Sequence, residues 1–333
     1  MYMVYIETGS TDVYYNFGCE YYFASEKKFE DTVFLFWRTE PTLMLGKYQN
    51  VAEEINLPYA KERGMHIVRR MSGGGTIYTD LGGWQFTFID RLRENEIEFQ
   101  RYIGPVIAAL GSFGVEASFN GRNDLCIGSR KISGNAQYRL GDSMIHHGSL
   151  LFDTDIESMV RATTVDSYKI FSKSIKSVRE RVCNIREMLP ESAASLSALE
   201  FKEAMISAIL SGSGKEERYA LTEEDRERIE TLAGEKFNNW ESIYGKNPSF
   251  NIEKSGRFAG GKVVFRLKVV HGRIESASVF GDFFSTMDAS ELCGALCGVS
   301  FDRESVLRAL REHGAEGAVY RISASELAGL IAD

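Results

Sequence analysis

"RRMSGGGTIY" (residues 69–78) brings two arginines and three glycines together within seven residues, and this combination is the strongest local signal in the chain. Glycine has no Cβ, so the backbone of Gly73, Gly74 and Gly75 can approach a ligand closely and adopt positive φ. Consecutive exposed N–H groups form an anion-binding nest, and an arginine beside them adds a planar charged fork suited to phosphate. The stretch therefore predicts a phosphate-binding loop.

This loop differs from the two common glycine-rich nucleotide motifs. The stretch contains neither G-x-x-x-x-G-K-[ST] nor G-x-G-x-x-G. The alternative interpretation is a flexible turn between two strands, and three glycines alone would favour it. The preceding arginine pair shifts the balance toward phosphate binding.

A second segment, "GRNDLCIGSRKISGNAQYR" (121–139), carries Lys131 at the start of a predicted strand. A lysine fixed at a strand end can hold a carboxylate and a phosphate oxygen together. The nearby Arg122, Arg130 and Arg139 add to the positive field. Taken alone, a lysine after a turn is more often simply solvated.

A third segment, "HHGSLLFD" (146–153), begins with two adjacent histidines. In a strand, neighbouring side chains point to opposite faces, so His146 and His147 cannot easily share one metal. We expect one of them to face a pocket and the other to face solvent or the sheet. A structural histidine is the alternative for either.

Bulk composition limits the class of protein. At about 150 residues per domain, 333 residues predict about two domains. A net charge of −8 argues against a general nucleic-acid or anionic-membrane partner. An odd number of cysteines, with no signal peptide and no apolar run of about 18 residues, predicts reduced thiols and a cytoplasmic protein. The cysteines are Cys19, Cys126, Cys183, Cys293 and Cys297.

Hydrophobic periodicity predicts strands first and helices later. Strands are expected at 32–38, 42–50, 66–70, 75–80, 84–90, 124–128, 131–139 and 143–153, with 75–80 and 84–90 forming a hairpin or a pair of strands. Helices are expected at 95–113, 197–210 and 222–237, with Pro105 in the first turn of its helix or kinking it. Residues 244–251 are typical of a linker, and a small α+β unit follows, with strands near 263–269 and 275–284 and helices near 288–297, 302–313 and 323–332.

In this order and at these separations, the three segments resemble those of the single-chain lipoate–protein ligases. The matching segments are the glycine-rich loop (69–82), the GRND turn (121–124), the lysine motif (130–139), the histidine strand (146–152), and two further stretches at 43–50 and 174–185. The C-terminal unit is similar to the accessory domain of that family. Any one motif is moderately specific, whereas the ordered set is highly specific and covers nearly the whole chain.

The resemblance implies an α+β fold. Residues 1–246 would form a catalytic domain shared with biotin ligases and class II synthetases, on a mixed, mostly antiparallel sheet. Residues 250–333 would form the small α+β accessory domain. The implied reaction has two steps: lipoate and ATP give lipoyl-adenylate, and a lysine of an acceptor then takes the lipoyl group. The acceptors would be lipoyl domains of 2-oxoacid dehydrogenase E2 subunits or glycine-cleavage H protein, with the ligase a monomer.

The resemblance also implies roles for individual residues. The ATP site would comprise Arg70, Gly73, Gly74, Gly75, Thr76, Ile77, Tyr78 and Lys131. The lipoate site would comprise Arg70, Lys131 and His147, with Lys131 as the catalytic residue. Phosphate transfer of this kind usually uses Mg²⁺, for which Asp124 is the candidate ligand; a structural cap is its alternative role. Residues 167–182 would close over the adenylate.

One position departs from the family pattern, and three rival functions remain open. The family often has a histidine where this chain has Thr79. An octanoyl or lipoyl transferase of the same fold would use a cysteine nucleophile and no ATP, and Cys126 is the only cysteine in the matched motifs. A biotin ligase would carry a G-R-G-R-type run, which is absent here. A protein that only binds lipoate or lipoyl domains is the third rival.

Overall fold

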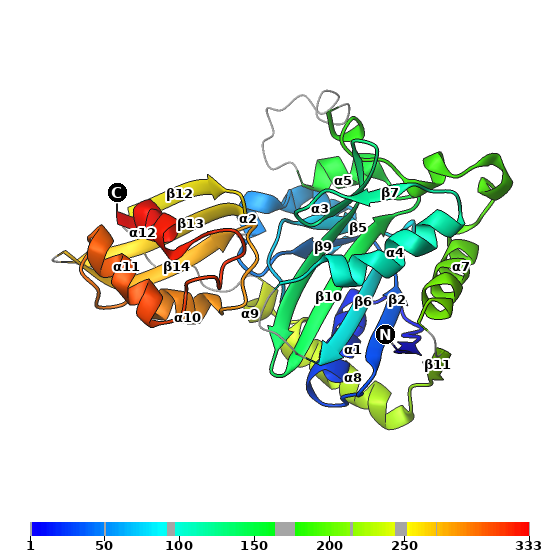
Figure 1. Ribbon diagram of the computed structural model, residues 1–333, viewed down its shortest axis with the longest axis horizontal. Coiled ribbons are helices and arrows are strands. Elements are labelled where there is room, and N and C mark those ends of the chain that lie inside the picture. The colour runs from blue at the N-terminus through cyan, green and yellow to red at the C-terminus, as the bar shows by residue number, and fades with distance from the viewer. Residues whose placement is uncertain are drawn as a thin grey trace.

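A large eight-stranded sheet organises this computed structural model, which describes residues 2–49, 51–91, 97–163, 177–213, 216–243, 252–270 and 272–332. Its strands, in spatial order, are β11 (Glu216–Tyr219), β1 (Met3–Ile6), β2 (Thr32–Trp37), β6 (Gly83–Arg91), β10 (Ser143–Leu151), β9 (Arg130–Leu140), β8 (Asp124–Ile127) and β7 (Ala117–Phe119). The β11–β1 and β1–β2 pairs are parallel and the others antiparallel (Figure 1). The predicted mixed, mostly antiparallel sheet is confirmed.

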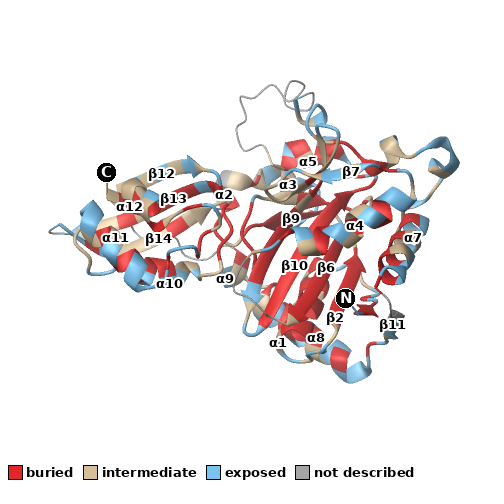
Figure 2. Ribbon diagram, in the orientation of Figure 1, coloured by how far each residue is buried: buried red, intermediate tan, exposed pale blue. Residues whose placement is uncertain are grey.

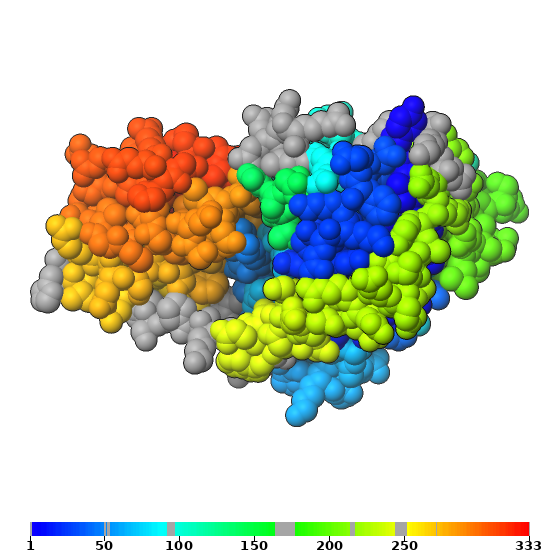
Figure 3. Space-filling view, turned by 90° about the horizontal axis from the view of Figure 1, so that it is seen from below, coloured from blue at the N-terminus to red at the C-terminus, as the bar shows by residue number. Residues whose placement is uncertain are grey.

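Helices cover both faces of this sheet. On one face lie α4 (Gln100–Ser112) and α7 (Ala198–Ser211), and on the other lie α1 (Val13–Ser25) and α8 (Glu223–Lys236). The strands β2 and β10 are therefore buried along their whole length (Figure 2). This explains why they appear in the sequence as continuous apolar or mixed runs without clear alternation. Figure 3 shows α1 and α8 side by side on the lower face of the molecule.

A second, three-stranded sheet carries the glycine-rich loop. Its order is β4 (His66–Arg69), β3 (Thr42–Leu45), β5 (Ile77–Thr79), and it packs near α2 (Val51–Glu54), α3 (Leu57–Glu62) and α5 (Ile156–Ala162). Of the two alternatives for 75–80 and 84–90, a hairpin or a pair of strands, the hairpin does not form. The two segments are strands of different sheets, because β5 pairs with β3 while β6 pairs with β2 and β10.

Most predicted strands and helices are confirmed, with differences that have local reasons. Helix α4 begins at Gln100 rather than at 95, and it contains Pro105 in its interior rather than in its first turn. The sequence did not predict β1, α1 or β11. Helix α1 has apolar or aromatic residues around much of its circumference and shows little 3.6-residue periodicity, while β11 is short and polar and depends on pairing with β1.

The C-terminal part has a core of its own. It comprises an antiparallel sheet of β12 (Ile252–Phe258), β13 (Gly261–Val270) and β14 (Arg273–Gly281), with α10 (Ala289–Gly294), α11 (Arg303–Glu312) and α12 (Ala324–Ala332) against it. Strand β12 was not predicted. The predicted linker, 244–251, lies outside the described residues. Within the described ranges, no helix is both long enough and apolar enough to cross a membrane.

The C-terminal part contacts the large sheet assembly through the segment after β14 and through the turn between β12 and β13. The ring of Phe283 stacks on that of Tyr48 with centroids 4.4 Å apart and an interplanar angle of 2°. The Lys47 ammonium pairs with Asp288 at 2.9 Å, and Arg122 donates to the carbonyl of Gly260 at 3.1 Å. These contacts bring Phe284 beside the glycine-rich loop.

Candidate active site

Two cavities meet at Lys131. The first, here the Arg70 cavity, is lined by Arg70 and His147 and by the apolar side chains of Phe17, Trp37, Met44, Ala136 and Phe284. The second, here the Asp124 cavity, is lined by Tyr78, Asn120, Asp124, Ser129, Met159 and Arg181. Both cavities share Thr76, Ile77, Lys131, Gly134 and Ser149. A molecule with an apolar part and a molecule with polar groups could therefore meet at one lysine.

Arg70 is a buried charge without a carboxylate partner among the described residues. Its side chain is 6% exposed, and burial, followed by the neighbouring Arg69, lowers its pKa to about 10, so it stays charged at neutral pH. The guanidinium donates to the carbonyls of Met44 (2.8 Å), Gly73 (2.8 Å) and Gly75 (2.7 Å). Burying an unpaired charge is costly, so this cavity is suited to an anion.

Arg69, by contrast, acts within the fold. Its guanidinium donates to backbone carbonyls of Gly46 (3.1 Å), Gln49 (2.5 Å) and Ile243 (2.8 Å). These bonds tie β4 to the loop after β3 and to α9 (Trp240–Ile243). Only the second arginine of the pair reaches a cavity.

The three glycines of the loop do not share one environment. The N–H of Gly74 donates to the carbonyl of Phe283 at 3.0 Å, and Gly74 has φ +91°. A Cβ on Gly73 would overlap that same carbonyl oxygen, while a Cβ on Gly75 would have nothing closer than 3.9 Å. A Cβ on Gly74 would lie 2.9 Å from the ring of Phe284, so close packing against Phe283 and Phe284 is a second reason for glycine at 73 and 74. Gly74 and Gly75 line the Arg70 cavity, whereas Gly73 lines neither cavity.

Thr76, Ile77 and Tyr78 continue from the loop into the wall between the cavities. Thr76 and Ile77 line both cavities and Tyr78 lines the Asp124 cavity, as expected for neighbours in one predicted site. The Thr76 hydroxyl donates to the side-chain oxygen of Gln49 at 2.8 Å. Burial, followed by the charge of Asp80, raises the pKa of Tyr78, so its hydroxyl stays protonated.

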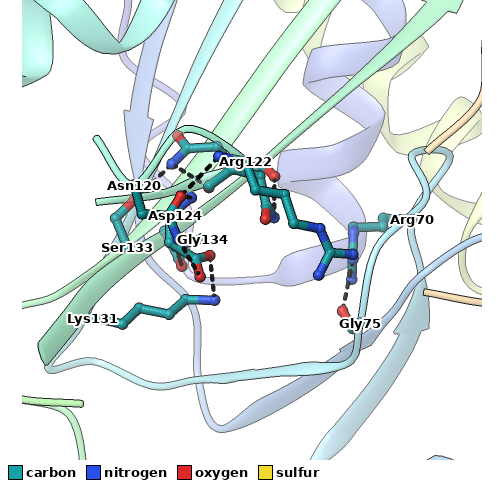
Figure 4. A network of polar contacts seen from close by, with 11 residues as sticks. Arg70, Gly75, Asn120, Arg122, Asp124, Lys131, Ser133 and Gly134 are labelled. Atoms are coloured by element: carbon teal, nitrogen blue, oxygen red, sulfur yellow. Dashed lines mark hydrogen bonds and ion pairs between the residues drawn. The ribbon is translucent and has the colours of Figure 1, made fainter. Parts of the chain in front are cut away.

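Lys131 is held at the junction by its backbone and paired through its side chain. Its N–H donates to the carbonyl of Arg181 at 2.7 Å, and its carbonyl accepts from Cys183 at 3.1 Å, so β9 is fixed on this edge. Its ammonium lies 2.7 Å from Asp124 Oδ1 (Figure 4). The two side chains are 37% and 24% exposed, so the pair is accessible to a ligand.

Asp124 is the only carboxylate among the described residues that line its cavity. In the described contacts its carboxylate does not cap a backbone N–H: it faces the Lys131 ammonium and accepts from the Asn120 side-chain amide at 3.3 Å, while the Asp124 backbone N–H donates to Asn120 Oδ1 at 3.1 Å. The described residues contain no group of three potential metal-ligating side chains. A single carboxylate beside an amide suits Mg²⁺ that arrives bound to phosphates, rather than a permanent metal site.

The two histidines of β10 do face opposite sides of the sheet. His146 is fully buried among aromatic rings, including Tyr102 at 5.1 Å between centroids. Burial, and then the proximity of His147, lowers its pKa well below the usual value, so it is neutral. His147 lies on the face of α1 and lines the Arg70 cavity. Sequence reasoning therefore selected the right histidine for a pocket.

Two further positions bear on the rival functions. Cys126 lines the Asp124 cavity and lies opposite Lys131 in the β8–β9 ladder, but burial and then Asp124 raise the pKa of its thiol. A protonated thiol is a poor nucleophile. Thr79, where the family often has histidine, accepts a hydrogen bond from Gln85 Nε2 at 2.7 Å.

Several residues of the cavities were not identified from the sequence. Phe17, Trp37, Gln85 and Phe284 line the Arg70 cavity from separate elements of the chain, and no local motif links them; Glu20, which contacts His147 from α1, was also missed. One signal was present: Glu20 is the only acidic residue within the aromatic run 13–25. Of the predicted closing segment 167–182, residues 167–176 lie outside the described part; Val178, Arg181 and Val182 line the Asp124 cavity.

Comparison with known proteins gives two family matches that together span most of the chain. The profile of the lipoyl protein ligase A/B catalytic domain matches residues 12–210, and that of the bacterial lipoate protein ligase C-terminus matches residues 247–331. Lipoate–protein ligase 1 of Staphylococcus aureus is 40% identical over 304 residues, covering 91% of this chain and 92% of that protein.

Two solved structures share the fold at low sequence identity. A P. falciparum protein, solved in complex with lipoate, superposes with a TM-score of 0.78 at 21% identity, covering 93% of this chain and 94% of that one. A lipoate–protein ligase A bound with ATP superposes with a TM-score of 0.58 at 22% identity, covering 73% of this chain and 98% of that one. At these identities the likeness concerns the fold.

Proposed function

Because the chain belongs to the lipoyl protein ligase A/B family, whose members are enzymes, we propose that it is an ATP-dependent lipoate–protein ligase. It would activate lipoate as lipoyl-AMP and then transfer the lipoyl group to a lysine of a lipoyl-domain protein. The observation that carries this proposal is the position of Lys131, which lines both the Arg70 cavity and the Asp124 cavity. An adenylating enzyme has to bring an acid and a nucleotide together at one point of positive charge.

The Arg70 cavity suits the acid. Its apolar wall of Phe17, Trp37 and Met44 matches a hydrocarbon chain, and Arg70 supplies a buried, permanently charged fork for the carboxylate. The ATP site would then lie in the Asp124 cavity, along Thr76, Ile77 and Tyr78. The fold shared with an ATP-bound ligase and with a lipoate-bound protein supports this division.

In the first step, a carboxylate oxygen of lipoate attacks the α-phosphorus of ATP, and pyrophosphate leaves. Arg70 would hold the carboxylate, and Lys131 would orient it and stabilise the charge on the transferring phosphate. In the second step, the neutral acceptor ε-amine attacks the carbonyl carbon, AMP leaves with the bonding electron pair, and the nitrogen loses a proton to solvent as the amide forms. Mg²⁺, when bound with ATP, supplies neutralisation of the polyphosphate, and Asp124 and Asn120 are the residues that would hold it.

The proposal also covers the loop glycines, His147, the cellular location and the acceptor proteins. Gly73 and Gly74 would contribute through loop geometry, and Gly75, with its open surroundings, through its backbone N–H. His147 would line the lipoyl chain's pocket. We expect a monomer, and a cytoplasmic location in line with the five free cysteines. The acceptors would be lipoyl domains of 2-oxoacid dehydrogenase E2 subunits or glycine-cleavage H protein.

The transferase alternative receives less support. It needs a cysteine thiolate, whereas the pKa of the Cys126 thiol is raised, and it leaves the Lys131–Asp124 pair without a role. A protein that only binds lipoate would have no need for a lysine shared by two cavities.

ATP–pyrophosphate exchange tests the proposal directly. The assay is run separately with lipoate, octanoate, biotin and no acid. We expect exchange with lipoate or octanoate alone, followed by transfer to a lipoyl domain that carries its acceptor lysine and no transfer to a Lys→Arg version of that domain. Exchange with biotin would favour a biotin ligase. Acyl transfer without ATP that is lost in Cys126→Ala would establish the transferase instead.

A further inference from the structure

A chain of buried hydrogen bonds connects Arg70 to a carboxylate on helix α1. Arg70 Nε donates to Ser72 Oγ at 3.1 Å, Ser72 Oγ lies 2.6 Å from His147 Nε2, and His147 Nδ1 lies 3.1 Å from Glu20 Oε2. All four side chains are nearly inaccessible to solvent: their exposed fractions are 6%, 0%, 7% and 1%. Glu20 therefore reaches the Arg70 guanidinium through one imidazole and one hydroxyl group.

With Glu20 as a carboxylate and His147 carrying one ring proton, the hydrogen-bonding capacity of these groups allows one direction along the chain. Ionised Glu20 can only accept, and it receives the hydroxyls of Thr87 (2.8 Å) and Tyr138 (2.9 Å) in addition to His147. The proton of neutral His147 therefore resides on Nδ1, which leaves Nε2 to accept from the Ser72 hydroxyl. The lone pairs of Ser72 Oγ are then free to accept from Arg70 Nε.

This direction matters for the arginine. The described contacts use Nε once, Nη1 once and Nη2 twice, which accounts for four of the five N–H groups and leaves one on Nη1. Met44, Gly73 and Gly75 accept through backbone carbonyls. The Nε bond is thus the only described hydrogen bond of the guanidinium whose acceptor is a side chain, and it is the one that a substitution can remove.

We propose that Glu20 is a positioning residue for the acid substrate: through His147 and Ser72 it fixes the orientation of the Arg70 guanidinium and so the affinity for the carboxylate. The chain of bonds also brings a negative charge near Arg70 without pairing with it. The buried arginine is partly compensated, yet its remaining N–H and its charge stay available to the substrate. This inference rests on the proposed function, because it assumes that Arg70 binds the acid.

The test compares two variants that interrupt the chain of hydrogen bonds with one control variant that leaves it intact. Ser72→Ala removes the link to Arg70, and Glu20→Gln keeps the size of the side chain but can reverse the proton on His147. Tyr138→Phe is the matched control, because it also removes one hydrogen bond to Glu20 but leaves the chain of bonds intact. We expect Ser72→Ala and Glu20→Gln to raise KM for the acid in pyrophosphate exchange about tenfold, with little change in kcat or in KM for ATP. Tyr138→Phe should leave the KM for the acid nearly unchanged.

A double-mutant cycle separates positioning from a general packing role. In an Arg70→Lys background, the Nε donor is gone, so Ser72→Ala should raise the KM for the acid by less than about twofold. Effects of Ser72→Ala that multiply with those of Arg70→Lys would overturn the proposal. Equal effects of Glu20→Gln and Tyr138→Phe would also overturn it, since Glu20 would then act only in packing.

A spectroscopic measurement on the unaltered protein does not depend on the variants folding. Selective ¹⁵N-histidine labelling reports which ring nitrogen of His147 carries the proton, with His147→Gln used only to assign the signal. We expect the Nδ1–H form; the Nε2–H form would overturn the proposal. If the unaltered protein shows no acid-dependent exchange, it is the proposed function that fails, and the ring-nitrogen measurement still decides the hydrogen-bond chain.

Discussion

The Arg70 cavity and the Asp124 cavity meet at Lys131, yet they hold their charges in different ways. In the first, a guanidinium that is 6% exposed has no carboxylate partner among the described residues. In the second, the Lys131 ammonium and the Asp124 carboxylate pair at 2.7 Å while remaining partly open to solvent. Both cavities have apolar walls, so the difference lies in the charges rather than in overall polarity.

This difference indicates how each cavity would respond to its ligand. An anion that enters the Arg70 cavity finds the Arg70 guanidinium already in position and has no carboxylate to displace from it. A nucleotide in the Asp124 cavity has to compete with Asp124 for Lys131, or to bring a cation that takes over the carboxylate. The predictions below first change charged side chains of the two cavities and then a histidine that lines neither of them.

The largest effect is expected at the residue that both cavities share. Lys131→Ala should lower acid-dependent pyrophosphate exchange by about 10²–10³-fold, as is typical when one transition-state donor is removed. The melting temperature should change little, because the side chain is 37% exposed. Arg130→Ala is the control: it removes a neighbouring positive charge that lines neither cavity and should retain exchange. Near-normal exchange by Lys131→Ala would refute its catalytic role.

Arg70→Lys tests the buried guanidinium. Lysine keeps a charge but lacks the fork, so KM for the acid should rise about 10–100-fold, with KM for ATP less affected. Arg69→Lys is a matched control, since Arg69 also binds backbone carbonyls but lines neither cavity. It should lower the melting temperature without raising KM for the acid. Equal effects on that KM would remove the distinction between the two arginines.

Asp124→Asn tests the partly exposed ion pair between Lys131 and Asp124. We expect KM for Mg·ATP to rise by about 3–10-fold, because a partly exposed charge interaction is worth about 1 kcal/mol. KM for the acid should hardly change. Titration of Mg²⁺ at fixed ATP should show a higher requirement in the variant. Asp142→Asn, which alters a surface ion pair with Lys28, serves as the control. An unchanged Mg²⁺ requirement would leave Asp124 only its role as the partner of Lys131.

The smallest effect on activity is expected at His146, the neighbour that faces away from both cavities. Its pKa is lowered in the folded state, so the unfolded state binds the proton more readily as pH falls below about 6.5. Stability should therefore decline toward acid pH, with about 1.4 kcal/mol per pH unit from this site until the folded-state pKa is reached. His146→Gln should remove this part of the slope. Melting curves between pH 5 and 8 provide the measurement, and identical slopes would contradict it.

The sequence alone identified most of the fold where local signals were strong. Strands β8, β9 and β10 were predicted because tight turns at Gly128 and Gly141, both with positive φ, separate them. Strand β11 was missed because its polar residues become a strand only through pairing with β1. The supposed hairpin after the glycine-rich loop failed for a related reason: adjacency in sequence does not determine which sheet a strand joins.

The same distinction applies to the candidate site. Arg70, Lys131 and His147 were identified because each belongs to a short motif whose residue types already suggest a chemistry. Glu20 and Phe284 lie more than 250 residues apart in sequence and approach the site only through the packing of α1 and the C-terminal part. Local patterns thus indicated residues that line the two cavities, whereas the residues that contact them from other elements could be found only in the tertiary structure.

The contact between the glycine-rich loop and Phe283 has a consequence for how the polypeptide can be divided. The loop of the larger part lies so close to the smaller part that Gly73 and Gly74 have no room for side chains, and Tyr48 stacks on the same phenylalanine. A cut between Ile243 and Ile252 would leave two fragments with complementary, otherwise uncovered apolar surfaces. Produced as separate polypeptides, the two fragments should bind each other through this contact.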